Sequence, residues 1–332
     1  MSKAIRNFLN SNDIPLDDKF ATLYNYQCSN ASQVYGLLEH AHLHVFFDTT
    51  YSCDLACGHC IYAANANTPL TFIPVENVLA HIHQAKTELE HICSFSLFGG
   101  EPTLAEIHNN GYFKTIADTV HETSGRLRMS TNGNWVNGKN ADYLTEQIVY
   151  MYNAVPHFQL QLSVDRFHKN CVESAIKVIQ QLDKYQELKS RPIVIRGFDF
   201  DKNLAKQFES LKTDNINIRT FFDFELIPSG RAAELAQTKN QSRDAQRAII
   251  LGDSDISGNV ALSALRPCSL CNRFQIELHF TPDGKVFTFD QLDYAKHITD
   301  AVNPDGSHKT YKQIKHDLSE LIFARYQNQI RK

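Results

Sequence analysis

Three cysteines, Cys53, Cys57 and Cys60, lie within eight residues in the run FFDTTYSCDLACGHCIY. Three thiolates this close in sequence can wrap one small inorganic centre, which constrains the path of the loop that carries them. Structural zinc sites take four protein ligands, so these three alone do not complete one. A four-iron cluster normally takes four cysteines, and three therefore leave one iron open to a substrate or cofactor. The spacing thus indicates a reactive iron–sulfur centre.

Other interpretations of the three cysteines remain open at this point. They can be small buried hydrophobic residues, or part of a zinc site that His59 or a distant residue completes. A disulfide framework is the weakest alternative, because 8 cysteines in 332 residues are too dilute for a disulfide scaffold.

A second motif follows an apolar strand at 94–98, which leads directly into Gly99, Gly100, Glu101 and Pro102. Adjacent glycines at the end of a strand let the backbone approach a ligand closely. The carboxyl ends of strands are also where α/β folds bind ligands. A plain turn is the alternative. Taken in order along the chain, the two segments resemble the CxxxCxxC and GGEP motifs of radical S-adenosylmethionine (SAM) enzymes.

The resemblance implies cofactors, a partner and a reaction. It implies that the three cysteines hold a 4Fe-4S cluster, that SAM binds the open iron, and that residues 99–102 contact SAM. On this view, a side chain at Gly99 or Gly100 fills the space where the backbone meets the methionine part of SAM. A reductase such as flavodoxin or ferredoxin supplies one electron, SAM is cleaved to methionine and a 5′-deoxyadenosyl radical, and this radical abstracts a hydrogen from the substrate.

Composition and charge narrow the class of protein. The net charge is −4 and hydrophobic residues make up 42% of the chain, so no overall basic field indicates a nucleic acid or an anionic membrane as partner. No apolar run approaches a transmembrane span. The start of the sequence lacks the apolar stretch and small-residue cleavage site of a signal peptide. We therefore expect a cytoplasmic protein, in a compartment that keeps thiols reduced.

Predicted strands and helices alternate along the middle of the chain. The strands are expected at 42–49, 94–99, 126–131, 158–164, 193–198 and 216–226, and the helices at 75–91, 112–123, 141–151 and 171–189. Such alternation predicts an α/β fold with parallel strands and right-handed crossovers. Six strand–helix units resemble the partial (β/α)6, TIM-like barrel of radical SAM enzymes over residues 43–230.

Three regions are expected. Residues 1–40 form an N-terminal extension, residues 41–235 form the radical SAM core barrel, and residues 236–332 form a linker and a small C-terminal extension. In the extension, Pro282-Asp283-Gly284 predicts a hairpin turn between strands at 274–281 and 285–289. An amphipathic helix is expected near 311–326.

Cys268 and Cys271 precede this hairpin. The resemblance to peptide-modifying radical SAM enzymes implies an auxiliary iron–sulfur cluster at this place. Those enzymes carry a further cysteine soon after the hairpin, whereas this chain has none after Cys271. The two thiols are alternatively catalytic hydrogen donors, partners of Cys28, Cys93 or Cys171, or packed residues.

Polar residues end two of the predicted strands. Functional residues of parallel barrels gather at the carboxyl ends of their strands. The resemblance implies that Ser130, Asn132 and Ser163 bind the ribose or carboxylate of SAM, and that His59 lies beside its adenine. The alternatives are a turn after Asn132, a helix cap and a solvent-exposed histidine.

Residues 163–168 and 228–232 resemble segments of the peptide-modifying group. Arg231 is expected to bind the carboxylate of SAM or of the substrate, with a surface salt bridge as the alternative. The favoured substrate is a ribosomally made peptide that undergoes epimerisation or cross-linking. The other hypotheses are a radical SAM enzyme that acts on a small metabolite or nucleotide, and a non-catalytic iron–sulfur or zinc binding protein.

Overall fold

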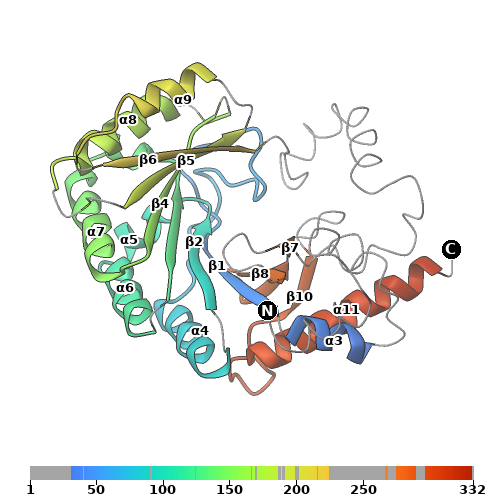
Figure 1. Ribbon diagram of the computed structural model, residues 1–332. Helices are drawn as coiled ribbons and strands as arrows, with labels where there is room; N and C mark the ends of the chain where they lie inside the picture. Colours follow the sequence, from blue (N-terminus) through green and yellow to red (C-terminus); the bar gives the residue numbers. More distant parts are fainter. Residues whose placement is uncertain are drawn as a thin grey trace.

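A mostly parallel sheet organises the molecule, in the order β10-β9-β8-β1-β2-β3-β4-β5-β6 (Figure 1). The computed structural model describes residues 31–39, 41–89, 92–123, 125–165, 167–168, 170–185, 188, 191–198, 202–214, 216–223, 266–267, 274–288 and 296–330. The six predicted strands are present as β1 (His42–Thr50), β2 (Ile92–Gly99), β3 (Leu127–Thr131), β4 (Phe158–Ser163), β5 (Pro192–Phe198) and β6 (Asn217–Asp223). Each pairs in parallel with the next. The sheet is open, so the predicted α/β fold with a partial, TIM-like barrel is confirmed.

Helices connect these strands and cover the outer side of the sheet (Figure 1). They are α4 (Val75–Glu88), α5 (Thr103–His108), α6 (Tyr112–Glu122), the 3-10 turn η2 (Asn134–Asn137), α7 (Ala141–Ala154), α8 (Cys171–Leu182) and α9 (Lys202–Glu209). In α6, Phe113, Ile116 and Val120 lie on one buried face, which places this segment against the sheet as a helix. The short helices α5 and α9 were not predicted, because a helix of about two turns displays little hydrophobic periodicity. None of the helices in the described ranges is both long and apolar enough to cross a membrane.

Two helices end earlier than predicted. Helix α4 stops at Glu88 rather than residue 91, since Leu89 already has extended backbone angles. Helix α8 stops at Leu182 rather than residue 189. The following bonds, from the Tyr185 N–H to the Leu182 carbonyl and from the Leu188 N–H to the Tyr185 carbonyl, span three residues instead of four. Apolar residues keep the helical spacing past this point, so the sequence pattern does not reveal the end.

Side chains of the parallel strands alternate between two faces with different chemistry. The outward-facing residues are apolar and buried under the helices, and they include Leu43, Val45, Phe47, Phe95, Leu97, Leu127, Met129, Leu160, Leu162, Ile193 and Ile195. The residues between them face the inside of the partial barrel. Many of these are polar: His44, Asp48, Ser94, Ser96, Arg128, Ser130, Gln159, Gln161 and Ser163. The inner face is therefore built for a polar ligand rather than for packing alone.

The predicted C-terminal hairpin is present as β8 (Phe274–Phe280) and β9 (Lys285–Thr288). Strand β8 also pairs in parallel with β1, with Phe46 opposite His279, so the hairpin continues the core sheet. The short β7 (Arg266–Pro267) pairs with β8, and β10 (Lys296–Asp300) pairs with β9. The final helix α11 (Tyr311–Ile330) lies beside α3 (Ala31–Glu39) (Figure 1).

Candidate active site

The loop that carries the three cysteines begins where β1 ends. Cys53 and Cys57 are buried, Cys60 is half-buried, and none of the three forms a disulfide. Backbone N–H groups approach two of the sulfurs, from Leu55 to Cys53 Sγ at 3.4 Å and from Ala64 to Cys60 Sγ at 3.3 Å. Hydrogen bonds to cysteine sulfur are a recurrent feature of iron–sulfur sites, where they stabilise the ligating thiolates.

The spacing of the three sulfurs separates zinc from a cluster. Two sulfurs on one zinc ion, each at 2.3 Å, are at most about 4.6 Å apart. Within the described ranges, the one set of three candidate ligand atoms that all lie within 4.8 Å of one another is His59, Asp165 and His168. The three cysteine sulfurs are not such a set, so they do not converge on one zinc ion. A cluster in which each sulfur binds a different iron does not require the three sulfurs to meet at one ion.

The electrostatics around Cys53 disfavour a bare thiolate. Burial raises the pKa of the Cys53 thiol, and the nearby Glu101 carboxylate raises it further. A thiolate here is therefore unfavourable unless a cation neutralises it. Bound iron would supply that positive charge, since coordination deprotonates a thiol.

A cavity of about 210 Å³ opens beside the cysteine loop. The loop forms one wall, the glycine pair forms another, and the carboxyl ends of β3, β4 and β5 form the rest. Of the residues predicted to bind SAM, those in its lining are His59, Gly99, Gly100, Ser130, Asn132 and Ser163. The structure thus gathers three cysteines and six predicted ligand-binding residues around one space.

The two glycines hold the end of β2 against the cysteine loop. The Gly100 N–H donates to the Thr50 carbonyl at 2.6 Å, and the Glu101 N–H donates to the Ser52 carbonyl at 2.9 Å. A Cβ atom on Gly100 would lie 2.0 Å from the Ser52 oxygen, and one on Gly99 would lie 2.6 Å from the Thr50 oxygen. The space that a side chain would fill is therefore occupied by the loop backbone, and not only by a ligand as the sequence suggested.

Glu101 and Pro102 are placed differently from the glycines, because neither lines the cavity. Pro102 is the N-cap of α5. Glu101 is 1% exposed and accepts hydrogen bonds from the Thr103 N–H and hydroxyl at 3.1 and 2.7 Å. It also accepts from the Thr131 hydroxyl at 2.7 Å and the Asn132 N–H at 2.9 Å. This carboxylate joins the ends of β2 and β3 and thereby positions Asn132.

Glu101 gives a pH-dependent prediction. Burial, and then the negative charge of Asp54, raise its pKa from 4.5 to about 7. The folded protein therefore binds an additional proton between these values, and its free energy of unfolding should fall as the pH rises from 4.5 to about 7. In Glu101→Gln this contribution should vanish, so the profile from urea unfolding should be flatter.

Glu146→Gln provides the control, since Glu146 is exposed on α7. It should reproduce the wild-type profile. A difference between wild type and Glu101→Gln that stays constant across this pH range would contradict the raised pKa.

Asn132 and Asp165 connect the cysteine loop to the strand ends. The Asn132 amide donates to Asp54 Oδ1 at 2.7 Å and lies 3.6 Å from Cys53 Sγ. Asp165 is buried, 2.9 Å from His168 Nδ1 and 3.6 Å from His59 Nε2. Burial alone would lower the pKa of His168, but hydrogen bonds with Asp165 and Cys57 raise it to about 10. These polar contacts fix the orientation of the cysteine loop.

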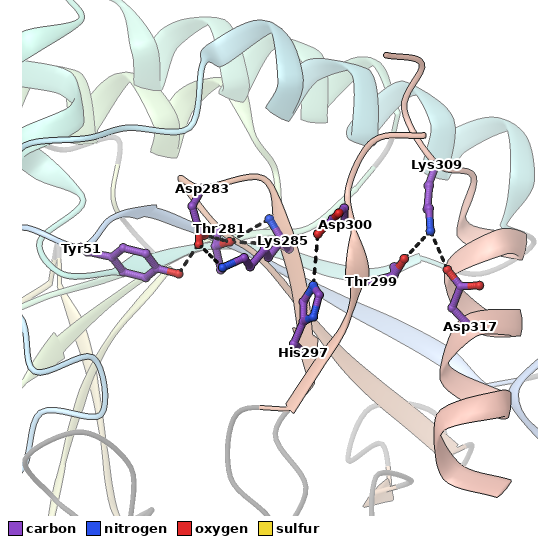
Figure 2. A network of polar contacts seen from close by, with 9 residues as sticks. All are labelled: Tyr51, Thr281, Asp283, Lys285, His297, Thr299, Asp300, Lys309 and Asp317. Carbon is purple, nitrogen blue, oxygen red and sulfur yellow. Dashed lines mark hydrogen bonds and ion pairs between the residues drawn. The ribbon is translucent and has the colours of Figure 1, made fainter. Parts of the chain in front are cut away.

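The C-terminal hairpin supports the loop from the other side. The Tyr51 hydroxyl donates to Asp283 in the hairpin turn at 3.4 Å, and Thr281 and Lys285 bind the same carboxylate (Figure 2). The Tyr62 hydroxyl lies 3.4 Å from His279 Nδ1, which is 3.1 Å from Asp48. One tyrosine precedes the three cysteines and the other follows them. The hairpin therefore contributes to the site through its contacts with Tyr51 and Tyr62.

Several residues of the site were not predicted. Tyr62, Gln161, Arg196 and Gly197 line the cavity. Arg196 lies at the end of β5, on the face toward the inside of the partial barrel. The alternation of side chains between the two faces of that strand is the sequence signal that could have identified it. The remaining predicted residues, Arg231, Cys268 and Cys271, lie outside the described residues.

Comparison with known proteins gives distant structural likenesses. No protein-family model and no curated protein matches the chain. SuiB from Streptococcus suis, bound to S-adenosylmethionine, is 12% identical to this chain, with a TM-score of 0.45. The match covers 74% of this chain and 60% of SuiB, so the chain spans less than two thirds of the length of SuiB. anSMEcpe with bound AdoMet and Cp18Cys peptide is 16% identical with a TM-score of 0.46, over 85% and 83%. BtrN in complex with AdoMet and 2-DOIA is 12% identical with a TM-score of 0.39, over 84% and 85%.

These three proteins are radical SAM enzymes. The chain resembles that family. The resemblance rests on the two motifs of this chain and on the cavity that both motifs border. Structural likeness at these identities and TM-scores assigns neither reaction nor substrate.

Proposed function

We propose that the protein is a radical SAM enzyme. The observation that carries this proposal is the spacing of Cys53, Cys57 and Cys60. They form no disulfide, their sulfurs do not all lie within 4.8 Å of one another as three ligands of one zinc ion would, and they border the same cavity as Gly99 and Gly100. The three cysteines would hold a 4Fe-4S cluster. When bound, the cluster and SAM supply one-electron reduction and the 5′-deoxyadenosyl radical that abstracts a hydrogen.

The residues of the chain would bind and orient SAM. Ser130, Asn132 and Ser163 offer hydroxyl and amide groups along the strand ends. Arg196, at the end of β5, offers a guanidinium that suits the carboxylate of SAM. His59 lines the cavity and offers its ring to the adenine, and the Phe167 ring lies behind it with its centroid 4.7 Å away.

The substrate is proposed to be a ribosomally made peptide, modified by epimerisation or cross-linking. The segments 163–168 and 228–232 support this class through their resemblance to peptide-modifying enzymes. A flavodoxin or ferredoxin is proposed as the electron donor. Cys268 and Cys271 are proposed either to donate hydrogen or to bind an auxiliary cluster. Iron content after reconstitution separates these roles, because a second cubane adds about four irons per chain.

SAM binding and cleavage test the proposal. Anaerobically reconstituted protein with dithionite should convert SAM to 5′-deoxyadenosine. Arg196→Gln should weaken SAM binding by about tenfold or more, because a charge-assisted hydrogen bond to the SAM carboxylate is lost. Isothermal titration measures the affinity directly.

Arg219→Gln is the matched control, since Arg219 is exposed on the neighbouring strand β6 and does not line the cavity. Its affinity for SAM should equal that of wild type. Reconstituted wild-type protein that binds iron but forms no 5′-deoxyadenosine would reject the enzyme and favour a non-catalytic iron–sulfur protein.

A further inference from the structure

A polar row crosses the inner face of the sheet below the SAM cavity. In the strand register, Ser96 on β2 lies opposite Arg128 on β3, which lies opposite Gln159 on β4. A second row lies nearer the amino ends of the strands, where Glu277 on β8 is opposite His44 on β1, and His44 is opposite Ser94 on β2. Neither row belongs to the cavity lining described above.

Arg128 is the distinctive member of these rows. Its neighbours Leu127 and Met129 are buried in the outer core, so the side chain between them faces the inside of the partial barrel. It is half-buried, and no hydrogen bond or ion pair within the described part of the chain engages its guanidinium. Burial lowers the pKa of Arg128 and the positive charge of Arg196 lowers it further, while Glu277 offsets part of this. A partly desolvated cation that Glu277 compensates only in part is costly, so this position is suited to an incoming anion.

Unsatisfied polar atoms lie in the same two rows. The Ser96 hydroxyl is buried and has no hydrogen-bond partner among the residues that the structure describes, and Ser96 is 1% exposed. His44 Nδ1 is 3.1 Å from the Ser94 hydroxyl, but its Nε2 is buried and finds no partner in the described part of the chain. Buried polar groups nearly always have partners, so two such atoms in the rows around a partly compensated arginine point to a ligand.

Arg128 and Ser96 lie on strands that also line the SAM cavity. Ser130 lines the cavity and follows Arg128 by two residues on the same face of β3. Phe98 lines the cavity and follows Ser96 by two residues on β2. Two residues along a strand correspond to about 6.6 Å, so Arg128 and Ser96 lie roughly one layer of side chains below the cavity.

We propose that Arg128, together with the Ser96 hydroxyl, binds a carboxylate of the substrate inside the partial barrel. This inference rests on the proposed function, because SAM above the site gives the substrate its place below. A guanidinium and a hydroxyl on adjacent strands offer several N–H donors and one O–H donor, which match the two oxygens of a carboxylate. The carboxylate can belong to an acidic side chain of a peptide or to a small free acid.

Arginine modification by phenylglyoxal tests the site without knowledge of the substrate. The reconstituted protein with SAM is treated with phenylglyoxal, and modified arginines are located by peptide mass spectrometry. Two pairs of probes are used: glutarate against neutral glutaramide, and N-acetyl-glutamate N-methylamide against the corresponding glutamine compound. The carboxylate member of at least one pair should slow modification of Arg128 by about fivefold or more, whereas the neutral member should not.

Arg126 supplies the internal control, because it is exposed and directly precedes the same strand. Its modification rate should not change with either probe. Protection by the glutamate compound indicates a peptide substrate, and protection by glutarate indicates a small acid. Equal protection of both arginines, or no protection of Arg128 by any carboxylate, would overturn the proposal.

Variants give a second readout. Carboxylate probes should raise the unfolding midpoint of wild type and Arg126→Gln but not of Arg128→Gln, with partial recovery in Arg128→Lys. A midpoint shift that persists in Arg128→Gln would contradict the assignment. Formation of 5′-deoxyadenosine by wild type is measured separately. Protection of Arg128 in a protein that does not cleave SAM would reject the proposed function and retain the carboxylate site.

Discussion

Replacing Cys53, Cys57 or Cys60 with alanine is expected to abolish SAM cleavage. Each sulfur would bind a different iron, so no neighbouring thiol can substitute for the one removed. Iron per chain should fall by about four, because a cubane held by two protein thiolates is not retained. Iron analysis, absorbance after anaerobic reconstitution, and 5′-deoxyadenosine formation check this together.

Cys171→Ser is the matched control for these three variants. Cys171 is also a buried free cysteine, but its thiol donates to the Asp165 carbonyl at 3.1 Å and it does not line the cavity. Serine retains that donor, so iron content and SAM cleavage should stay near wild type. Wild-type amounts of 5′-deoxyadenosine from any of the three alanine variants would refute the cluster assignment.

The parts of the site that are close in sequence could be predicted. The cysteine loop and the glycine pair depend on short spacings, which the sequence displays directly. The strand-end rule then located Ser130, Asn132 and Ser163, because each follows a segment whose alternation identifies a strand. The structure places all of these residues around one cavity.

The parts that depend on distant pairing could not be predicted. Strand β8 lies beside β1 although more than 200 residues separate them, and no local pattern specifies a parallel partner. The contacts of Tyr51 and Tyr62 with the hairpin follow from that pairing. The polar inner residues were visible as alternation in the sequence. Whether such a face is packed or available to a ligand depends on how far the sheet closes, which is a property of all strands together.

Glu101 shows a different limit of motif reasoning. Its place after two glycines predicted a residue that contacts SAM. In the structure, its oxygens accept hydrogen bonds from Thr103, Thr131 and Asn132. The carboxylate therefore joins the ends of β2 and β3 behind the cavity. The motif identified a segment whose two glycines line the cavity, whereas the hydrogen bonds of Glu101 depend on the neighbouring strand β3.

Gly100→Ala is expected to reduce both SAM binding and iron content. The new Cβ atom would lie 2.0 Å from the Ser52 oxygen and 2.7 Å from its carbonyl carbon, and these backbone atoms immediately precede Cys53. The loop must therefore move, and overpacking of this kind typically costs about 1–3 kcal/mol. Iron per chain after reconstitution should fall to about half or less of the wild-type value, with a parallel loss of SAM affinity.

Gly58→Ala is the control, because Gly58 lies within the cysteine loop and its added Cβ would meet no atom within 4 Å. It should retain both iron and SAM affinity. The two variants together separate two roles of Gly100, which are to admit SAM and to leave room for the cysteine loop. The motif alone does not distinguish these roles. If Gly100→Ala loses SAM affinity but keeps full iron, the glycine serves only to admit the ligand. If it loses both while Gly58→Ala loses neither, the absent side chain is needed because the end of β2 and the cysteine loop share one space, and the cluster and the SAM pocket are then built by a single backbone contact.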